Sequence, residues 1–254
     1  MAGEVRLERS DKIARIILDN PIKHNAFNEM MIQSLFDILQ DLKKDKDLKV
    51  IILEARGRSF CAGADLEWMQ KMVDFTKEEN YADSLKLAEM LNLLYTMPQV
   101  TIAKVQGAAY GGGVGLVSCC DIAIASKNAN FCFSEVKLGL IPAVISPYVI
   151  KTIGLKQAKR YVFTAEIIDS HKALEINLIN EIVDENELEQ VVKDMADNIV
   201  IHSSNAIGRG KLLLNNIANK EINKELIDIT AQEISELRVS KEAQIRLKKF
   251  LDHG

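Results

Sequence analysis

The most constraining feature of the sequence is an alternation of short strands and helices joined by glycine-rich loops. Apolar segments at 50–53 and 101–105 have the length and composition of buried strands, and helical periodicity follows each of them. Glycine-rich loops lie at these junctions, at 59–66 and 107–115. Alternating strands and helices of this kind predict an α/β fold in the first part of the chain.

Other local signals complete this first part. Residues 5–8 and 13–18 flank a short polar turn and predict a β-hairpin. Asn28 is a suitable cap for an amphipathic helix over 29–44. Ser146 is expected to cap, and Pro147 to open, a later helix. The remaining expected elements are a helix containing Leu66, Met69 and Val73, a helix over 78–96, an apolar helix over 114–120, and strands over 121–125 and 130–133.

Helical periodicity dominates after about residue 155, apart from a short strand near 181–183. The successive helices are expected at 186–201, 204–219, 221–239 and 241–251. We therefore expect an α/β core over 1–199 and a helical C-terminal segment over 200–254.

Composition and charge narrow the function classes. The chain has 254 residues and a formal net charge of −4, which disfavours binding to nucleic acid because phosphate contacts require a concentrated basic surface. Its four cysteines form no CxxC pair, and no histidine stands at metal-ligand spacing from them, so no metal site is expected. No signal peptide or membrane span is recognised. These features predict a cytoplasmic protein without a membrane association.

The two glycine-rich loops are the first candidates for chemistry. A strand-to-helix junction exposes backbone N–H groups where the helix dipole favours negative charge. The second loop does not match GxGxxG, because Leu116 stands at the last position, and the chain contains no P-loop motif. The loop also fits a purely structural role in tight helix packing. Three consecutive glycines carry an entropic cost, which favours a functional use.

Glu135 is the second candidate. It follows the apolar segment 131–133, and a carboxyl in apolar surroundings has a raised pKa that suits proton transfer near neutral pH. An exposed glutamate at the end of a strand would give the same local pattern. A serine-histidine-aspartate triad is not indicated, because the sequence has no GxSxG motif.

Taken together, these segments resemble the enoyl-CoA hydratase/isomerase (crotonase) superfamily. The matching motifs are Asn20-Pro21-x-Lys23-x-Asn25-Ala26-x-Asn28, Phe60-Cys61-Ala62-Gly63-Ala64-Asp65-Leu66, Gly107-x-Ala109-x-Gly111-Gly112-Gly113-x-Gly115-Leu116, Cys120-Asp121-Ile122-Ala123 and Phe131-x-x-Ser134-Glu135-x-x-Leu138-Gly139-Leu140-Ile141-Pro142. They occur in the family's order and at its spacings, across nearly the whole chain.

The resemblance implies a crotonase-like spiral of ββα units followed by a helical segment that builds homotrimers, often paired into hexamers. It also implies a site for an acyl-CoA thioester, with CoA arriving as part of the substrate and no separate cofactor. The amides of Ala64 and Gly112 would form an oxyanion hole, and Glu135 would be the catalytic acid/base. The residues implied in substrate or CoA binding are Lys23, His24, Ala26, Ala62, Asp65, Leu66, Tyr110, Gly111, Gly115, Ser134 and Pro142.

Two departures from the family's pattern bear on mechanism. The first of the two glutamates typical of hydratases would fall at Gly115, which has no side chain. The C-terminal residues 250–254 lack the basic, proline-containing tail common in the family. The strings at 111–116 and 138–148 are similar to those of bacterial 3-methylglutaconyl-CoA hydratases of leucine and isoprenoid breakdown, which share the glycine.

The resemblance therefore predicts hydration of a 2-enoyl-CoA, with 3-methylglutaconyl-CoA as the expected substrate, in leucine, isoprenoid or fatty-acid catabolism. Double-bond isomerisation and acyl-CoA decarboxylation remain as alternatives on the same scaffold, and a non-catalytic RNA-binding role is a further one. A dicarboxylyl substrate would require a cation near the acyl group. The candidates for that cation are Lys104, Lys137 and Lys151.

Overall fold

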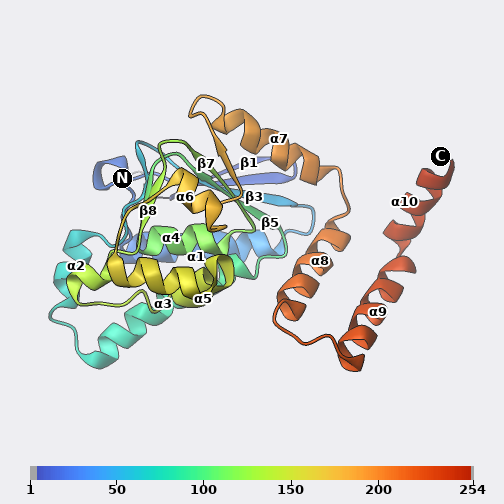
Figure 1. Ribbon diagram of the computed structural model, residues 1–254. Coiled ribbons are helices and arrows are strands. Elements are labelled where there is room, and N and C mark those ends of the chain that lie inside the picture. The colour runs from blue at the N-terminus through green and yellow to red at the C-terminus, as the bar shows by residue number, and fades with distance from the viewer. Residues whose placement is uncertain (1–4, 253–254) are drawn as a thin grey trace. The chain divides into compact units, whose positions relative to one another are not determined.

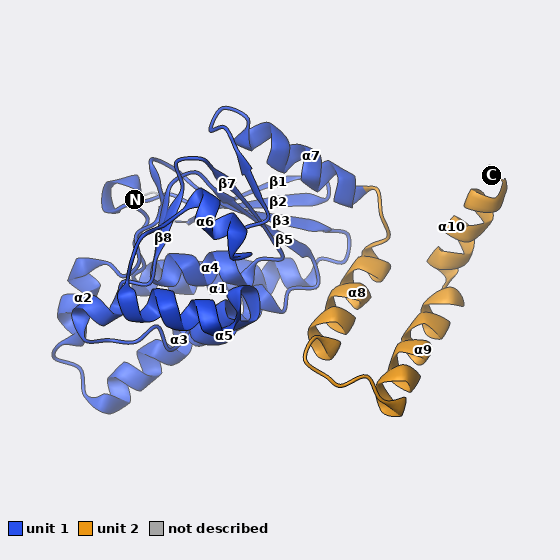
Figure 2. Ribbon diagram, viewed as in Figure 1, with its two compact units in different colours: residues 1–200 blue, residues 201–254 orange. Residues whose placement is uncertain are grey.

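The computed structural model describes residues 5–252. The chain forms two compact units, residues 1–200 and 201–254, shown in blue and orange in Figure 2. The first contains all the strands of the described chain, and the second contains three helices.

A six-stranded sheet organises the first unit. Its strands are β1 (Val5–Ser10), β2 (Ile13–Leu18), β3 (Val50–Ala55), β5 (Val100–Val105), β7 (Ile122–Ser126) and β10 (Glu181–Val183), side by side in that order. The β1–β2 pair is antiparallel and forms the expected hairpin, with Asp11 in the left-handed conformation at its turn. All the other neighbours are parallel.

Both faces of this sheet are covered, because the strands alternate their side chains between two cores. On one face Val50, Ile52 and Ile102 pack in a cluster with residues of α7 (Leu188–Val200). On the other face Ile51 and Leu53 belong to the main core, together with α1 (Glu29–Lys44), α3 (Lys77–Tyr95) and α4 (Gly112–Cys119). Figure 1 shows α7 on one side of the sheet and α1, α3 and α4 on the opposite side.

A second, four-stranded sheet was not expected in full from the sequence. It consists of β4 (Ser59–Cys61), β6 (Ala108–Tyr110), β8 (Asn130–Cys132) and β9 (Ile168–Asp169) in that order. The first three are parallel, and β9 is antiparallel to β8. Only β8 was predicted, because the other strands are two or three residues long and lie in segments that resemble loops.

The two sheets are built from one repeated unit, in which a strand of the large sheet leads to a strand of the small sheet and then to a helix. β3 and β4 lead to α2 (Leu66–Met72), and β5 and β6 lead to α4. β7 and β8 lead to a 3-10 turn (Glu135–Leu138) and then to α5 (Ser146–Thr164). Because β4, β6 and β8 are parallel neighbours, the segments that follow them emerge at the same edge of the small sheet.

Two predicted helix starts are wrong. α4 begins at Gly112 rather than at 114, so the glycines form its first turn. Ile145, and not Ser146, is the cap of α5; the Ser146 hydroxyl instead donates a hydrogen bond of 2.6 Å to the Pro142 carbonyl. Pro147 does lie in the first turn, as expected. Gly154, with φ of 74°, divides α5 at a kink.

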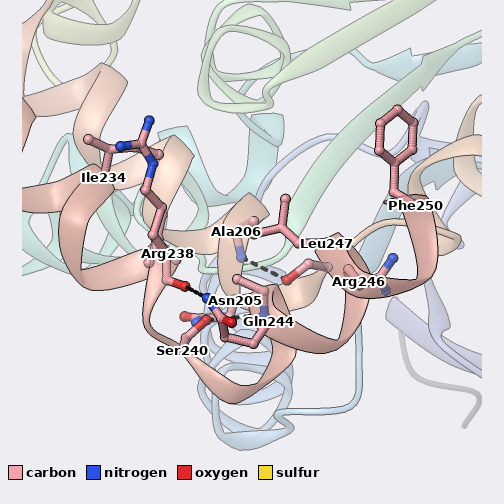
Figure 3. Close-up of a pocket in the computed structure, with 12 residues that line it drawn as sticks. Asn205, Ala206, Ile234, Arg238, Ser240, Gln244, Arg246, Leu247 and Phe250 are labelled. Atoms are coloured by element: carbon pink, nitrogen blue, oxygen red, sulfur yellow. Dashed lines mark hydrogen bonds between the residues drawn. The ribbon is translucent and has the colours of Figure 1, made fainter. Parts of the chain in front are cut away.

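The second unit consists of α8 (Ser204–Ile217), α9 (Lys224–Arg238) and α10 (Lys241–Asp252). Leu226 is its one buried apolar residue within the described chain. Arg209 of α8 joins α9 through Glu233 at 2.6 Å and Glu236 at 2.7 Å. A groove of about 570 Å³ lies between these helices, and Figure 3 shows Leu247 and Phe250 along it.

Candidate active site

Three of the predicted catalytic residues follow the three parallel strands of the small sheet. Ala64 comes after β4, Gly112 follows β6 with one residue between them, and Glu135 comes after β8. Close backbone approaches join the three segments. A Cβ atom placed on Gly63 would lie 3.3 Å from the Tyr110 carbonyl oxygen, and one placed on Gly111 would lie 3.2 Å from Glu135 Oε1. The strand order thus gathers residues that are far apart in the sequence into one site.

The Ala64 amide is directed by a short parallel bridge to Phe27. The Phe27 N–H donates to the Gly63 carbonyl at 2.6 Å, and the Asp65 N–H donates to the Phe27 carbonyl at 2.7 Å. In a parallel bridge the central residue's own N–H points away from its partner strand. The Ala64 N–H accordingly has no acceptor within residues 5–252, and it is free to bind a ligand oxygen.

The Gly112 amide is free for a different reason, because it belongs to the first turn of α4. Gly111 uses its own N–H to bond the Cys132 carbonyl at 2.9 Å, whereas the Gly112 N–H has no acceptor in the described part of the chain. A Cβ atom on Gly112 would lie 2.7 Å from the Phe27 ring. Packing against this ring therefore requires glycine at position 112, although no pattern in the sequence singles out Phe27.

Glu135 is half-buried at the start of the 3-10 turn. Its Oε2 is fully buried and has no hydrogen-bond partner among the described residues. Burial raises the pKa of this carboxyl above its ordinary value, against a smaller opposing effect of its own backbone N–H. A buried carboxyl oxygen without a partner is costly unless a ligand or substrate supplies one.

The predicted CoA-binding segments lie side by side. The Ala62 N–H donates to the His24 carbonyl at 3.0 Å, which joins the 23–26 turn to the loop after β4. Lys23 Nζ forms ion pairs with Asp65 at 3.0 Å and Glu67 at 2.9 Å. Asp65 also caps α2 by accepting from the Glu67 and Trp68 amides. Burial alone would raise the pKa of Asp65, but Lys23 and these amides hold it below its ordinary value.

His24 occupies the left-handed region, with φ of 53°, in this same turn. Its Nδ1 lies 3.0 Å from Ser59 Oγ, and its Nε2 lies 3.4 Å from Arg58 Nη2. A guanidinium group only donates, so Nε2 acts as the acceptor and Nδ1 carries the hydrogen that Ser59 accepts.

The other residues predicted to bind the substrate or CoA lie in several different surroundings. The Tyr110 hydroxyl donates to Asn130 at 2.6 Å along the small sheet. Leu66 is 80% exposed at the start of α2. Pro142 lines a separate apolar pocket of about 130 Å³ with Phe133 and residues of α5. Ala26 is buried, Ser134 is half-buried just before Glu135, and Gly115 is buried within α4.

Two of the three lysines considered for a distal carboxylate are already engaged. Lys104 pairs with Glu54 at 2.8 Å and with Glu189, on the sheet face below α7. Lys151 contacts the Tyr95 hydroxyl at 3.3 Å and its ring. Lys137 is exposed and lies two residues after Glu135 in the sequence. It is therefore the remaining candidate for pairing with a distal carboxylate.

Within residues 5–252, no group of three or more histidine, cysteine, aspartate or glutamate side chains could hold a metal ion. No helix of this part of the chain is long and apolar enough to span a membrane.

Comparison with known proteins agrees with this architecture. The family of enoyl-CoA hydratases/isomerases matches residues 8–253. A solved structure described as an enoyl-CoA hydratase/isomerase (crotonase) from Legionella pneumophila is 43% identical, with a TM-score of 0.95 over 100% of this chain and 98% of that one. An enoyl-CoA hydratase from Shewanella pealeana is 40% identical, also with a TM-score of 0.95, over 98% and 94% of the two chains.

A short-chain-enoyl-CoA hydratase of Clostridium acetobutylicum is 32% identical over 84% of this chain and 81% of its own length. The fold and the site thus define an enzyme of the crotonase type. The chain belongs to the enoyl-CoA hydratase/isomerase family.

Proposed function

We propose that this protein is an enoyl-CoA hydratase that adds water to a 2-enoyl-CoA thioester through an enolate held by the Ala64 and Gly112 amides. The observation that carries the proposal is the convergence of two free backbone N–H groups with a buried, unpaired carboxyl oxygen of Glu135. Relatives named as hydratases support the same reaction class. CoA enters as part of the substrate, and the reaction requires no separate cofactor.

The two amides are proposed to bind the thioester oxygen. Negative charge builds up on this oxygen as water adds to the β-carbon, so hydrogen bonds to it strengthen towards the transition state. Both donors are fixed before the reaction, Ala64 by the bridge to Phe27 and Gly112 by the start of α4. Loss of one such donor typically lowers the rate by about 10²- to 10³-fold.

Glu135 is proposed to carry the proton. As a carboxylate it accepts a proton from water while the water oxygen attacks, and as a carboxylic acid it returns a proton to the α-carbon. Its raised pKa brings the two forms closer in free energy at neutral pH, which suits both steps.

The proposed substrate is 3-methylglutaconyl-CoA, in leucine, isoprenoid or fatty-acid catabolism. Support comes from the motif strings around Gly115 and Pro142 and from Lys137, whose exposed ammonium group is near Glu135 in the chain and could pair with a distal carboxylate. We also propose a cytoplasmic location.

Double-bond isomerisation is the second candidate function, and a specific observation favours it. One carboxylate can move a proton between two carbons of the acyl chain without any attacking water, and the surroundings of Gly115 are apolar. The oxyanion hole would serve this reaction equally well.

A homotrimer, or a hexamer formed by two trimers, is proposed for the assembly. The second unit buries almost no apolar core of its own, and it exposes Leu247 at 47% and Phe250 at 75% beside a groove. Large apolar surfaces of this kind mark protein interfaces, so other copies of the chain are the proposed partners.

The test is to incubate the purified protein with 3-methylglutaconyl-CoA and, separately, with crotonyl-CoA. Loss of the conjugated enoyl-thioester absorbance is followed, and products are identified by mass, with Glu135→Gln as the control. Addition of one water, abolished in the variant, is the expected result. Absence of hydration of both substrates would refute the proposal, and loss of CO₂ or a shifted double bond would assign another enolate reaction.

A further inference from the structure

The space beside Gly115 is filled by a side chain from another element. Gly115 lies one helical turn after Gly112, so the two residues share a face of α4. A Cβ atom on Gly115 would lie 2.3 Å from Ile145 Cγ2, well inside any real contact distance, and 3.8 Å from Leu91 Cδ1. A side chain at position 115 therefore requires Ile145 to move.

Ile145 has little freedom to move. It caps α5, which packs against α4 (Figure 1), and its carbonyl accepts from the Tyr148 and Val149 amides, both at 3.1 Å. The preceding turn is tied by the Ser146 hydroxyl to the Pro142 carbonyl. Only 3% of Ile145 is exposed, and its branched Cβ restricts its rotamers.

We propose that Ile145 fills the space at position 115 with apolar volume and so leaves Glu135 as the single proton-transferring side chain. This inference rests on the proposed function for its chemistry, although its steric part does not. The three atoms nearest to a Cβ at position 115 are all carbons, two of Ile145 and one of Leu91, so the immediate surroundings of this position are apolar.

The proton balance of hydration then passes through one carboxyl group. Glu135 takes a proton from water as the water oxygen bonds to the β-carbon and the π electrons move onto the thioester oxygen. The carboxyl group next delivers that proton to the α-carbon, and the electron pair returns to re-form the thioester carbonyl. Water is added in full, and Glu135 ends as it began. The pH profile of the hydration rate should therefore show a single ionisation on its acidic limb.

The steric part is tested by thermal unfolding. Gly115→Ala should lower Tm by several degrees, because overpacking of a filled core is destabilising. Ile145→Ala in the same chain should restore part of this loss, since it removes Cγ2 at 2.3 Å and leaves only the milder approach of Ile145 Cβ at 3.0 Å. Ile145→Val is the matched control: it is also smaller, but its two γ carbons keep the clash, so it should not restore Tm. Equal rescue by alanine and valine, or no loss in Gly115→Ala, overturns the inference.

The chemical part is tested with a carboxylate placed in the cleared space. Gly115→Glu with Ile145→Ala should hydrate crotonyl-CoA about tenfold faster than Ile145→Ala alone and should gain a second ionisation in its pH profile. Gly115→Gln with Ile145→Ala has the same size without the charge and should show neither effect. Gly115→Glu with Ile145 intact should stay below the double variant.

The inference is wrong if the two double variants, with glutamate or glutamine at position 115, hydrate crotonyl-CoA at the same rate. It is also wrong if Gly115→Glu with Ile145 intact is as fast as the double variant. A wild-type enzyme that hydrates neither substrate refutes the proposed function instead. In that case the Tm comparison still decides whether Ile145 fills the space at position 115, and the pH profile is measured on the reaction found.

Discussion

At the residue scale, Glu135 combines a proposed catalytic role with the cost of burying a carboxyl group. Its carboxyl is half-buried, one oxygen is unpaired within the described chain, and burial raises its pKa. Removing the charge should therefore separate activity from stability. We expect Glu135→Gln to lower the hydration rate by about 10²-fold or more, with a native circular dichroism spectrum and a Tm no lower than that of the wild type.

The raised pKa of Glu135 also fixes the sign of a pH effect on stability. A carboxyl with a raised pKa in the folded state binds its proton more tightly than in the unfolded chain. Its favourable contribution is complete below the ordinary glutamate pKa, about 4.3, and is lost as pH rises through the higher folded value.

The unfolding free energy of the wild type minus that of Glu135→Gln should consequently fall as pH rises from 4 towards neutrality, over the range beginning at about 4.3. Urea denaturation at a series of pH values measures this difference. A difference that stays constant, or rises, across the range would contradict a raised pKa.

Gly112 provides a steric prediction at the same scale. Gly112→Ala places a Cβ atom 2.7 Å from the Phe27 ring and should cost about 1–3 kcal/mol of unfolding free energy. Because Phe27 also orients Ala64, the rate should fall as well. Gly210→Ala is the matched control, since nothing lies within 4 Å of its new Cβ in α8; it should leave the rate unchanged. Equal effects of the two substitutions would contradict the packing described.

At the scale of elements, the residue that caps α2 also holds one side of the proposed oxyanion hole. Asp65 accepts from the Glu67 and Trp68 amides, and its own N–H bonds to Phe27 next to Ala64. Asp65→Ala should cost about 0.5–2 kcal/mol and also lower the hydration rate. Asp65→Asn keeps a cap acceptor and should be milder in both respects.

Thr76→Ala serves as the control for Asp65, because Thr76 caps α3 in the same way through a capping box with Glu79. It should lose a similar amount of stability in denaturant titrations while keeping the rate. A Thr76 variant that lost activity in parallel would show that cap loss acts through general destabilisation rather than through Ala64.

Elements with local signals were predictable from the sequence. Asn28 followed by regular apolar spacing predicted a helix over 29–44, and α1 spans Glu29–Lys44. β4, β6 and β9 were missed, because such short strands are defined by partners that are distant in the chain, such as Ala108 for Ser59 and Asn130 for Asp169. Local patterns carry no information about that pairing.

The candidate site was likewise predictable only where the signal is local. The glycine loops and Glu135 stand out in the sequence, but the sheet order that gathers them does not. Phe27 and Ile145 gave no signal at all, since each acts by filling the volume next to a glycine from another element. Lys49 shows the limit of charge patterning: it stands in a stretch rich in lysine and aspartate, yet it is buried and donates to the Val200 carbonyl at 2.7 Å.

At the scale of the whole molecule, the second unit is the part that most needs a partner. We expect Phe250→Asp combined with Leu247→Asp to convert a trimer or hexamer into smaller species in analytical ultracentrifugation, because both side chains line an exposed apolar groove. Lys249→Asp, an exposed change on the same helix, should leave the assembly intact. A monomeric wild-type protein would contradict the proposed assembly.

The most direct test of the central claim, an enolate held by two amides and protonated by Glu135, uses a substrate that cannot be hydrated. Butyryl-CoA is incubated with the enzyme in D₂O, and deuterium at the α-carbon is measured by mass spectrometry. The account predicts α-carbon exchange with the wild type and a large loss of exchange in Glu135→Gln. A folded wild-type enzyme that binds butyryl-CoA without exchange, or a Glu135→Gln variant that exchanges as fast, would contradict it.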